Sequence, residues 1–248
     1  MSRMTASYDD TVRVLGAEML VADPDLPDGT LCLTFDDGPG ETDGDGPGPR
    51  TTALAELLAE AEVPATFFMC GSGVRRHPRS VARVLELGHG VGNHTDTHPS
   101  LTALPDEAVA REVRSAQEAL REAGVTGRIP FRPPYGDWDE RTASALLSDP
   151  TLSSELSGVV GWDVDPQDWA SWQSRDAAEV AATRLVDACV RARRGLVLLH
   201  DCSADPDPLG AELRAGNRAL ESARLAIPAL RAHGFTFVAL HDALPRPA

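Results

Sequence analysis

The stretch Thr30–Pro39, TLCLTFDDGP, decides the fold of this chain. Its first six residues, TLCLTF, make a short and mostly apolar run of the length of a strand. The run ends on Asp36 and Asp37, and Gly38-Pro39 follows with the residue types of a turn. This pattern predicts a strand whose carboxyl end carries two adjacent carboxylates.

The pattern of a short apolar run followed by a turn recurs along the whole chain. Seven strands are predicted, at Thr30–Phe35, Ala65–Cys70, Gly90–Asn93, Ile129–Arg132, Gly158–Asp163, Leu196–His200 and Phe235–Leu240. Apolar residues at helical spacing lie between them. They predict helices at Thr51–Glu62, at Ser80–Leu87, around Val109–Leu120, from Asp176 to about Val190, and within Ala211–Ala232, where Pro228 is expected to kink or break the last helix.

Alternating strands and helices predict a mainly parallel sheet with its helices outside, as a barrel or an open doubly wound sheet. In both architectures the functional groups gather at the carboxyl ends of the strands. We expect a single domain over residues 1–248, with a core at about 29–241 and an N-terminal extension at 1–28. The loop Gly40–Arg50, rich in glycine, proline and acidic residues, interrupts this pattern after the first strand.

Composition and charge narrow the classes of partner. The 248 residues are 42% hydrophobic and 25% charged, and the net charge of −15 argues against binding nucleic acid or an anionic membrane. The N-terminal residues lack the pattern of a secretory signal, so a cytoplasmic location is expected. The four cysteines show no CxxC spacing. Cys202 follows His200-Asp201, and a catalytic thiol there is a disfavoured alternative.

Two motifs supply a candidate metal site. Of the aspartates that end the first strand, one can bind a metal while the other takes a proton, although a capped turn would use the same residues. HTDTHP places His94 and His98 at i, i+4, on one face if the segment forms a helical turn. With Asp37 they form a two-histidine, one-carboxylate set that leaves positions open for water and substrate. Surface or capping histidines are the alternative.

Three more motifs follow later strands. Arg132, in FRPPYG, could pair with a carboxylate and keep it ionised. The segment WDVDPQDW, residues 162–169, could form an apolar pocket edged by acid, in which one aspartate orients a histidine. His200 ends the strand Leu196–His200, where it could act as a general acid. Each motif also has a purely structural interpretation, but all five fall at predicted strand ends on one face.

In this order, TFDDGP, HTDTHP, RPPY, DPQDW and LLHD resemble the polysaccharide deacetylases of carbohydrate esterase family 4, which share a NodB-homology domain. The resemblance runs from about Gly29 to about Leu240. It implies a distorted (β/α) barrel of about seven parallel strands with outer helices. It also implies hydrolysis of an N-acetyl or similar acyl amide on an amino sugar, with one divalent metal ion, usually zinc.

The resemblance also implies a role for each matching residue. Asp37, His94 and His98 would bind the metal. Asp36 would be the general base, held ionised by Arg132, and His200 the general acid. The remaining implied roles are an oxyanion donor from the backbone N–H of Tyr135, orientation of the histidine by Asp165, and an acyl slot lined by Trp162, Trp169 and Leu198.

Several alternatives share these residues. The same chemistry could act on a small acylated biosynthetic intermediate or on an O-acetyl ester. A non-catalytic binding domain is disfavoured because base, ligands and acid are all present. An iron oxygenase would need neither Asp36 nor His200. The missing export signal and the loop Gly40–Arg50 favour a short, soluble acylated amino sugar over an assembled wall polymer.

Overall fold

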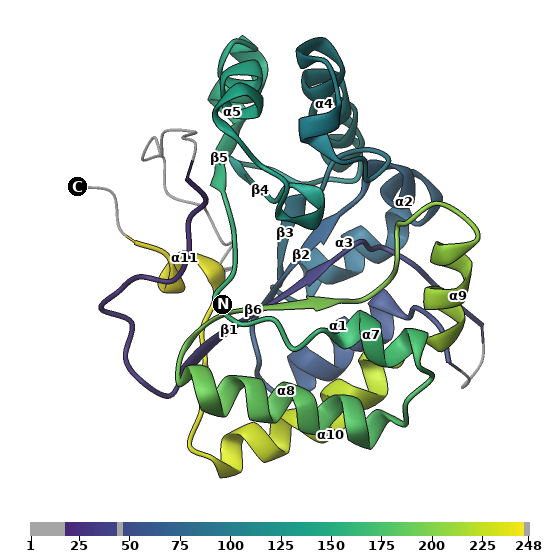
Figure 1. Ribbon diagram of the computed structural model, residues 1–248, viewed down its shortest axis with the longest axis vertical. Coiled ribbons are helices and arrows are strands. Elements are labelled where there is room, and N and C mark those ends of the chain that lie inside the picture. The colour runs from purple at the N-terminus through teal and green to yellow at the C-terminus, as the bar shows by residue number, and fades with distance from the viewer. Residues whose placement is uncertain (1–17, 44–46, 246–248) are drawn as a thin grey trace.

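The computed structural model describes residues 18–43 and 47–245, in which seven strands form one curved parallel sheet (Figure 1). The strands are β1 Thr30–Asp36, β2 Ala65–Met69, β3 Gly90–Asn93, β4 Ile129–Phe131, β5 Leu156–Val159, β6 Gly195–His200 and β7 Thr236–Phe237. Their order is β5-β4-β3-β2-β1-β6, and β7 pairs with the first residues of β1. Every pair is parallel, as the alternating pattern predicted.

The sheet curls toward a barrel because the chain beyond β5 reaches back to β6. Val164 forms an isolated parallel bridge with Val197, and the backbone N–H of Leu198 donates to the carbonyl of Val164 at 2.9 Å. The two outer strands of the sheet are thereby joined through one short segment rather than a full strand. The predicted distorted barrel of about seven strands is confirmed.

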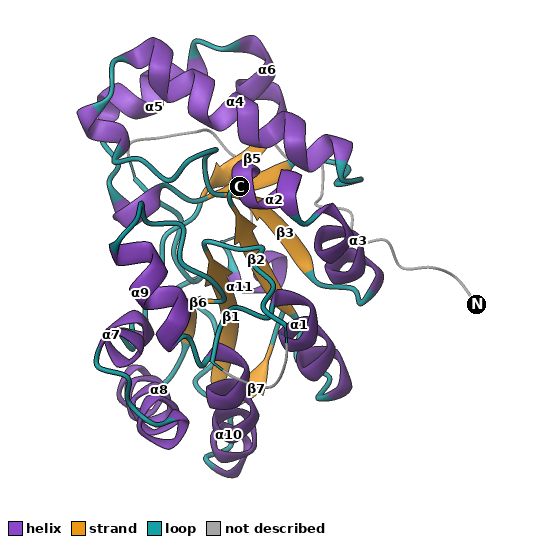
Figure 2. Cartoon of the chain, turned by 90° about the vertical axis from the view of Figure 1, so that its right-hand side faces the viewer, coloured by secondary structure: helices purple, strands orange, loops and turns teal. Residues whose placement is uncertain are grey.

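Most helices cover the outside of this sheet, and the short α11 packs inside its curve (Figure 2). The described helices are α1 Thr51–Glu60, α2 Gly71–Arg76, α3 Pro78–Glu86, α4 Asp106–Glu122, α5 Glu140–Leu147, α6 Pro150–Glu155, α7 Asp168–Gln173, α8 Ala178–Ala192, α9 Leu209–Gly216, α10 Ala219–Ala232 and α11 Leu240–Ala243, with short 3₁₀ turns η1 Leu101–Ala103 and η2 Pro134–Gly136. Across the described ranges, none has the length and apolar character that a bilayer crossing requires.

Successive side chains of β1 lie in two different environments, one on the outer and one on the inner face of the sheet. Leu31, Leu33 and Phe35 belong to the large apolar cluster that α1, α3, α8 and α10 bury against the sheet. The residues between them have the opposite direction, because successive side chains of a strand point to opposite faces. Cys32 packs with residues of β2, β6 and α11 in a separate cluster inside the curve of the sheet. Asp36 shares this inner face and so emerges inside the barrel mouth.

Some predicted boundaries are wrong. The predicted strand Phe235–Leu240 is only two residues long, and α11 begins at Leu240. Of the kink or break expected at Pro228, the break is absent, because α10 continues through Pro228. The chain breaks instead at Asn217, between α9 and α10. This buried amide donates to the carbonyl of Asp201 at 3.0 Å and accepts from the N–H of Ala219 at 2.8 Å, which ends one helix and starts the next.

Candidate active site

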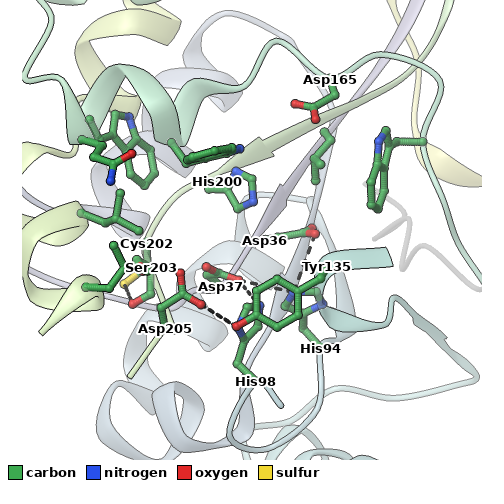
Figure 3. A pocket seen from close by; sticks show the side chains of 17 residues that line it. Asp36, Asp37, His94, His98, Tyr135, Asp165, His200, Cys202, Ser203 and Asp205 are labelled. Carbon is green, nitrogen blue, oxygen red and sulfur yellow. Dashed lines mark hydrogen bonds and ion pairs between the residues drawn. The ribbon is translucent and has the colours of Figure 1, made fainter. Parts of the chain in front are cut away.

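The carboxyl ends of the strands surround a pocket of about 350 Å³ (Figure 3). Residues from all five motifs line or support it. The sequence-predicted residues in its wall are Asp36, Asp37, His94, His98, Tyr135, Trp162, Asp165, Trp169, Leu198 and His200. Arg132, the remaining predicted residue, lies fully buried beneath the pocket, where it contacts Asp36. Residues more than 160 positions apart thus meet in one cavity, as expected when motifs follow parallel strands.

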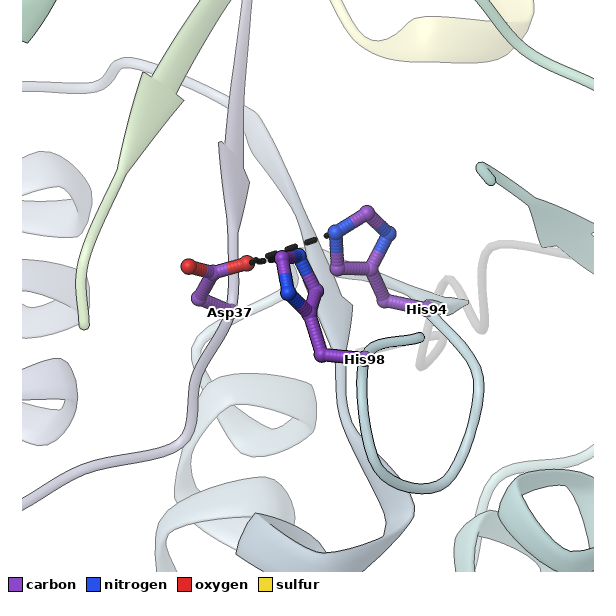
Figure 4. Close-up of side chains that lie close together, drawn as sticks. All are labelled: Asp37, His94 and His98. Atoms are coloured by element: carbon purple, nitrogen blue, oxygen red, sulfur yellow. Dashed lines mark ion pairs between the residues drawn. The ribbon is translucent and has the colours of Figure 1, made fainter. Parts of the chain in front are cut away.

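Asp37, His94 and His98 lie together at the floor of the pocket (Figure 4). Oδ1 of Asp37 is 3.3 Å from Nε2 of His94 and 3.0 Å from Nε2 of His98. All three side chains are buried, and their possible ligand atoms lie within 4.8 Å of one another. Two imidazole nitrogens and one carboxylate oxygen converging on one point have the composition of a catalytic metal site.

The segment His94–His98 forms no helical turn, although a turn would also have placed the two histidines on one face. No helix covers these residues, and His98 has a φ of 62°. The loop is held by local hydrogen bonds instead. Oδ1 of Asn93 accepts from the N–H of Thr95 at 2.9 Å, and Oγ1 of Thr95 accepts from the N–H of His98 at 3.1 Å. Asp37 is also left-handed, at φ 77°, so two of the three candidate ligands have backbone conformations that the surrounding structure must enforce.

The carboxylate oxygen and the imidazole nitrogens that face one another in this cluster are suited to bind a cation. Oδ1 of Asp37 is buried and, among the described residues, has no hydrogen-bond partner. Nδ1 of His94 contacts the carbonyl oxygen of Arg132 at 2.8 Å, which favours the tautomer with its proton on Nδ1 and a lone pair on Nε2. Burial would raise the pKa of Asp37, but the charge of His98 and the close approach of both imidazole rings hold it well below its usual range. This carboxylate is therefore ionised.

Asp36 forms a buried ion pair with Arg132. Nη1 of Arg132 donates to Oδ1 of Asp36 at 2.8 Å and to Oγ1 of Thr34 at 2.8 Å. The other guanidinium nitrogens donate to the carbonyl oxygens of Val160 and Gly161. The buried guanidinium thus places its positive charge and a hydrogen-bond donor directly beside the Asp36 carboxyl group. Asp36 is thereby prepared to accept a proton, which agrees with the predicted pairing.

His200 is held by Asp168, and the prediction of Asp165 for this role is wrong. Nδ1 of His200 lies 2.8 Å from Oδ1 of Asp168, whose Oδ2 accepts from the backbone N–H of His200 at 2.8 Å. Asp165 lines the pocket, but its Oδ1 accepts from the N–H of Gln167. The left-handed Gln167, at φ 54°, directly precedes α7 and turns the chain. This turn brings the second aspartate of DPQDW, rather than the first, to the histidine.

The charge state of His200 suits a general acid. Burial would lower the pKa of His200, but the charge and hydrogen bond of Asp168 and the charges of Asp37 and Asp36 raise it to about 10. The imidazolium is thus the favoured form at neutral pH. Cys202 also lines the pocket, but burial raises the pKa of this thiol to about 12, which keeps it protonated and argues against a nucleophilic role.

Aromatic and aliphatic side chains form the remaining wall. Trp162, Trp169 and Leu198, the predicted acyl slot, all line the pocket. The indole of Trp162 lies near Arg132, with the guanidinium carbon 5.8 Å from its ring centre. Trp172 was not predicted, yet it is buried with its ring edge toward His200, at 6.3 Å between centroids. Trp172 thus gives His200 an apolar neighbour on this side of the pocket.

The segment that follows His200 supplies groups that sequence reasoning missed. The N–H of Ala204 donates to Oδ2 of Asp37 at 3.1 Å. Asp205 accepts from the hydroxyl of Tyr135 at 2.6 Å, and its Oδ1 lies 3.5 Å from Nδ1 of His98. Their only sequence signal is the acidic run DCSADPD directly after the motif. The spacing of that run does not reveal which carboxylate turns inward.

The loop Gly40–Arg50 lies beside the same site, as its position after TFDDGP suggested. Its described residues line a second cavity that shares Asp37 and Asp205 with the first. Residues 44–46 lie outside the described residues. Glu41 and Arg50 form an antiparallel bridge across the base of the loop. The insertion is therefore anchored next to the candidate metal ligands.

Several known proteins are similar to this chain in sequence and in fold. A family model described as polysaccharide deacetylase matches residues 23–149. A chitooligosaccharide deacetylase of Rhizobium leguminosarum bv. trifolii is 37% identical over 220 residues, which cover 86% of this chain and 91% of that protein. The structure of the peptidoglycan deacetylase PdaC from Bacillus subtilis is similar, with a TM-score of 0.65, 25% identity, and coverage of 89% of this chain and 91% of that one.

The chitin deacetylase from Colletotrichum lindemuthianum shares the fold, with a TM-score of 0.70 and 21% identity over 94% of this chain and 97% of that one. These findings confirm the family that the five motifs resemble and the deacetylase class of the enzyme. The site geometry adds a buried set of metal-ligand types, a carboxylate paired with arginine, and a histidine in one pocket. This chain therefore belongs to the polysaccharide deacetylase family.

Proposed function

We propose that this enzyme removes the acetyl group from an N-acetylated amino sugar of a soluble, short oligosaccharide, and that its metal ion is zinc. The main support for this proposal is that five residues surround one pocket. They are the candidate ligands Asp37, His94 and His98, together with Asp36 and His200. The size of the substrate is supported by the relative named a chitooligosaccharide deacetylase, which this chain covers almost entirely. Two imidazoles and one carboxylate are a common ligand set of catalytic zinc.

A zinc ion held by Asp37, His94 and His98 would polarise the acetyl carbonyl and lower the pKa of the attacking water. Asp36 then takes a proton from that water as it adds to the carbonyl carbon. Arg132 holds the Asp36 carboxyl group in position for this step through its hydrogen bond to Oδ1. The backbone N–H of Tyr135 would donate to the oxyanion that develops on the former carbonyl oxygen.

Collapse of the tetrahedral adduct breaks the C–N bond. The amine is a poor leaving group unless it receives a proton, and His200 donates it from the side of the pocket edged by tryptophans. Asp168 stabilises the imidazolium before transfer and fixes the orientation of the ring. The products are acetate and the free amino sugar. The product amine is a cation, and the net charge of −15 on the protein attracts it. The charge of the protein therefore favours release of this product only weakly.

The direct test measures the release of acetate from N-acetylglucosamine oligomers by purified protein, together with its metal content. We expect turnover that a chelator abolishes and that zinc restores. The panel should include an O-acetylated sugar, because the same groups could cleave an ester. Absence of acetate release from every N-acetylated sugar by zinc-loaded protein would reject the proposed function.

A further inference from the structure

Asp205 joins two groups that come from different loops of the active site. It lies five residues after the catalytic His200, in the loop between β6 and α9. Its Oδ1 accepts a hydrogen bond of 2.6 Å from the hydroxyl of Tyr135, as the dashed line in Figure 3 marks. The same oxygen lies 3.5 Å from Nδ1 of His98. The Asp205 side chain is largely shielded, with 17% of its surface exposed.

His98 needs an acceptor on its outer nitrogen. Its Nε2 faces Asp37 Oδ1 at 3.0 Å, so Nε2 is the nitrogen that can bind a metal. A neutral imidazole that coordinates through Nε2 carries its proton on Nδ1. Nδ1 is buried and lacks a hydrogen-bond partner among the described residues. A buried N–H without an acceptor costs about 1–3 kcal/mol, and the carboxylate that faces it is Asp205.

The two candidate histidine ligands are therefore supported differently. Nδ1 of His94 has the backbone carbonyl of Arg132 at 2.8 Å. That support cannot be removed by changing a side chain. His98 faces a carboxylate instead, at a longer distance that leaves room for the ring to move when it binds a metal. The orientation of His98 thus depends on one side chain that lies outside all five motifs.

Tyr135 depends on the same carboxylate. Its backbone is left-handed, with φ 59° and ψ 5°, which is costly for a residue with a bulky side chain. Its ring packs edge-on against His98, with 4.7 Å between centroids. The bond from its hydroxyl to Asp205 ties the far end of the side chain to the opposite loop. This tether restrains the peptide unit that would present the oxyanion donor.

We propose that Asp205 is a positioning residue that orients His98 for metal binding and tethers Tyr135 for stabilisation of the oxyanion. This inference rests on the proposed function, because it assumes that His98 binds the metal and that the N–H of Tyr135 faces the oxyanion. Asp205 acts through these two residues and not on the substrate. The two effects are separable, since one concerns metal affinity and the other the rate at saturating metal.

Metal affinity is measured first, by competition of each purified metal-free protein with a chromophoric chelator for Zn²⁺. Asp205→Ala should weaken binding about 10–100-fold, the usual effect of losing a carboxylate behind a histidine ligand. Tyr135→Phe keeps Asp205 and should bind zinc as wild type does. Asp207→Ala is the matched control, because Asp207 lies in the same loop but is exposed and pairs with Arg214. It should bind zinc with unchanged affinity.

The rate is measured next, with zinc in excess over its dissociation constant for each variant. Asp205→Ala and Tyr135→Phe should each lower kcat about tenfold, less than the 10²–10³ of removing an oxyanion donor outright, with KM within about twofold of wild type. The double variant should be no slower than Asp205→Ala, because both changes break one tether. If the losses in kcat of the two single variants add in the double variant, the proposed tether is contradicted.

The outcomes separate this inference from the proposed function. If wild-type protein does not bind zinc or release acetate, the proposed function fails. If wild type does both but Asp205→Ala binds zinc equally well, or no more weakly than Asp207→Ala, the orienting role of Asp205 is rejected. Asp205→Asn keeps the shape of the side chain and covers the case that Asp205→Ala does not fold. It should bind zinc at least about threefold more weakly than wild type, and unchanged binding would reject the inference.

Discussion

Asp168 forms two hydrogen bonds with His200. Its Oδ1 lies 2.8 Å from the ring Nδ1, and its Oδ2 accepts from the backbone N–H of His200 at 2.8 Å. This bidentate contact fixes both the position and the tautomer of the histidine, and leaves Nε2 as the nitrogen that can deliver a proton. The aspartate starts α7 and the histidine ends β6, so the contact also joins two elements on the rim of the barrel.

We expect Asp168→Asn to lower kcat by roughly 10²–10⁴-fold, the usual effect of losing a general acid. An amide can present its nitrogen toward the ring and favour the wrong tautomer, even though the shape of the side chain is kept. Asp165→Asn is the matched comparison, because Asp165 lines the same pocket but accepts its hydrogen bond from the N–H of Gln167. A larger loss for Asp165→Asn than for Asp168→Asn would contradict the assignment.

The pH dependence of the rate should respond to the same variant. Asp168 is the largest of the influences that raise the pKa of His200, to about 10 against the opposing effect of burial. A general acid works only while protonated, so activity is lost as pH rises through its pKa. Asp168→Asn should therefore move the alkaline limb of the kcat profile to lower pH. A profile with an unmoved alkaline limb would show that another group controls it.

Removing His98 should empty the metal site. His98→Ala leaves Asp37 and His94 as two ligands, too few to retain the ion through purification. Elemental analysis should find about one zinc per wild-type chain and much less in the variant. The matched control is His233→Ala, at the exposed end of α10. Wild-type zinc content and full turnover in His98→Ala would remove this residue from the ligand set.

Replacing the proposed base separates chemistry from metal binding. Asp36→Asn should keep zinc but reduce turnover by roughly 10²–10⁴-fold, because an amide cannot take the proton from water. It also leaves the buried Arg132 guanidinium without its counter-charge, for which a loss of about 3–5 kcal/mol in unfolding free energy is typical. Zinc analysis, acetate release and urea unfolding measure the three effects. Near-normal turnover would mean that no carboxylate base is required.

Substrate length is tested by comparing kcat/KM on an N-acetylated monomer, a tetramer and insoluble polymer. We expect soluble short substrates to be used far better than the polymer. The loop Gly40–Arg50 lies beside the candidate metal ligands and lines the second cavity, so it would contact a long substrate on that side. A kcat/KM that climbs steeply from monomer through tetramer to polymer would indicate an extended groove, in which remote subsites supply binding energy to the transition state.

The local pattern of the sequence determined the architecture and the edge of the sheet at which the candidate functional residues lie. The run TLCLTF before two aspartates could be interpreted without neighbours, because a buried strand needs a short apolar run and a strand end needs turn residues. Since parallel strands point the same way, motifs at their carboxyl ends must meet. The same rule predicts that Asp36, His94 and His200 lie close together, and all three line one pocket.

Only the tertiary structure decided which polar groups touch. DPQDW offers two aspartates, and the left-handed Gln167 between them selects Asp168 as the partner of His200. The acidic segment after His200 offers Asp201, Asp205 and Asp207, and only the folded loop turns Asp205 toward Tyr135. Side-chain periodicity is lost in irregular backbone. Contacts there depend on the dihedral angles of single residues and on partners distant in the chain, which no local pattern encodes.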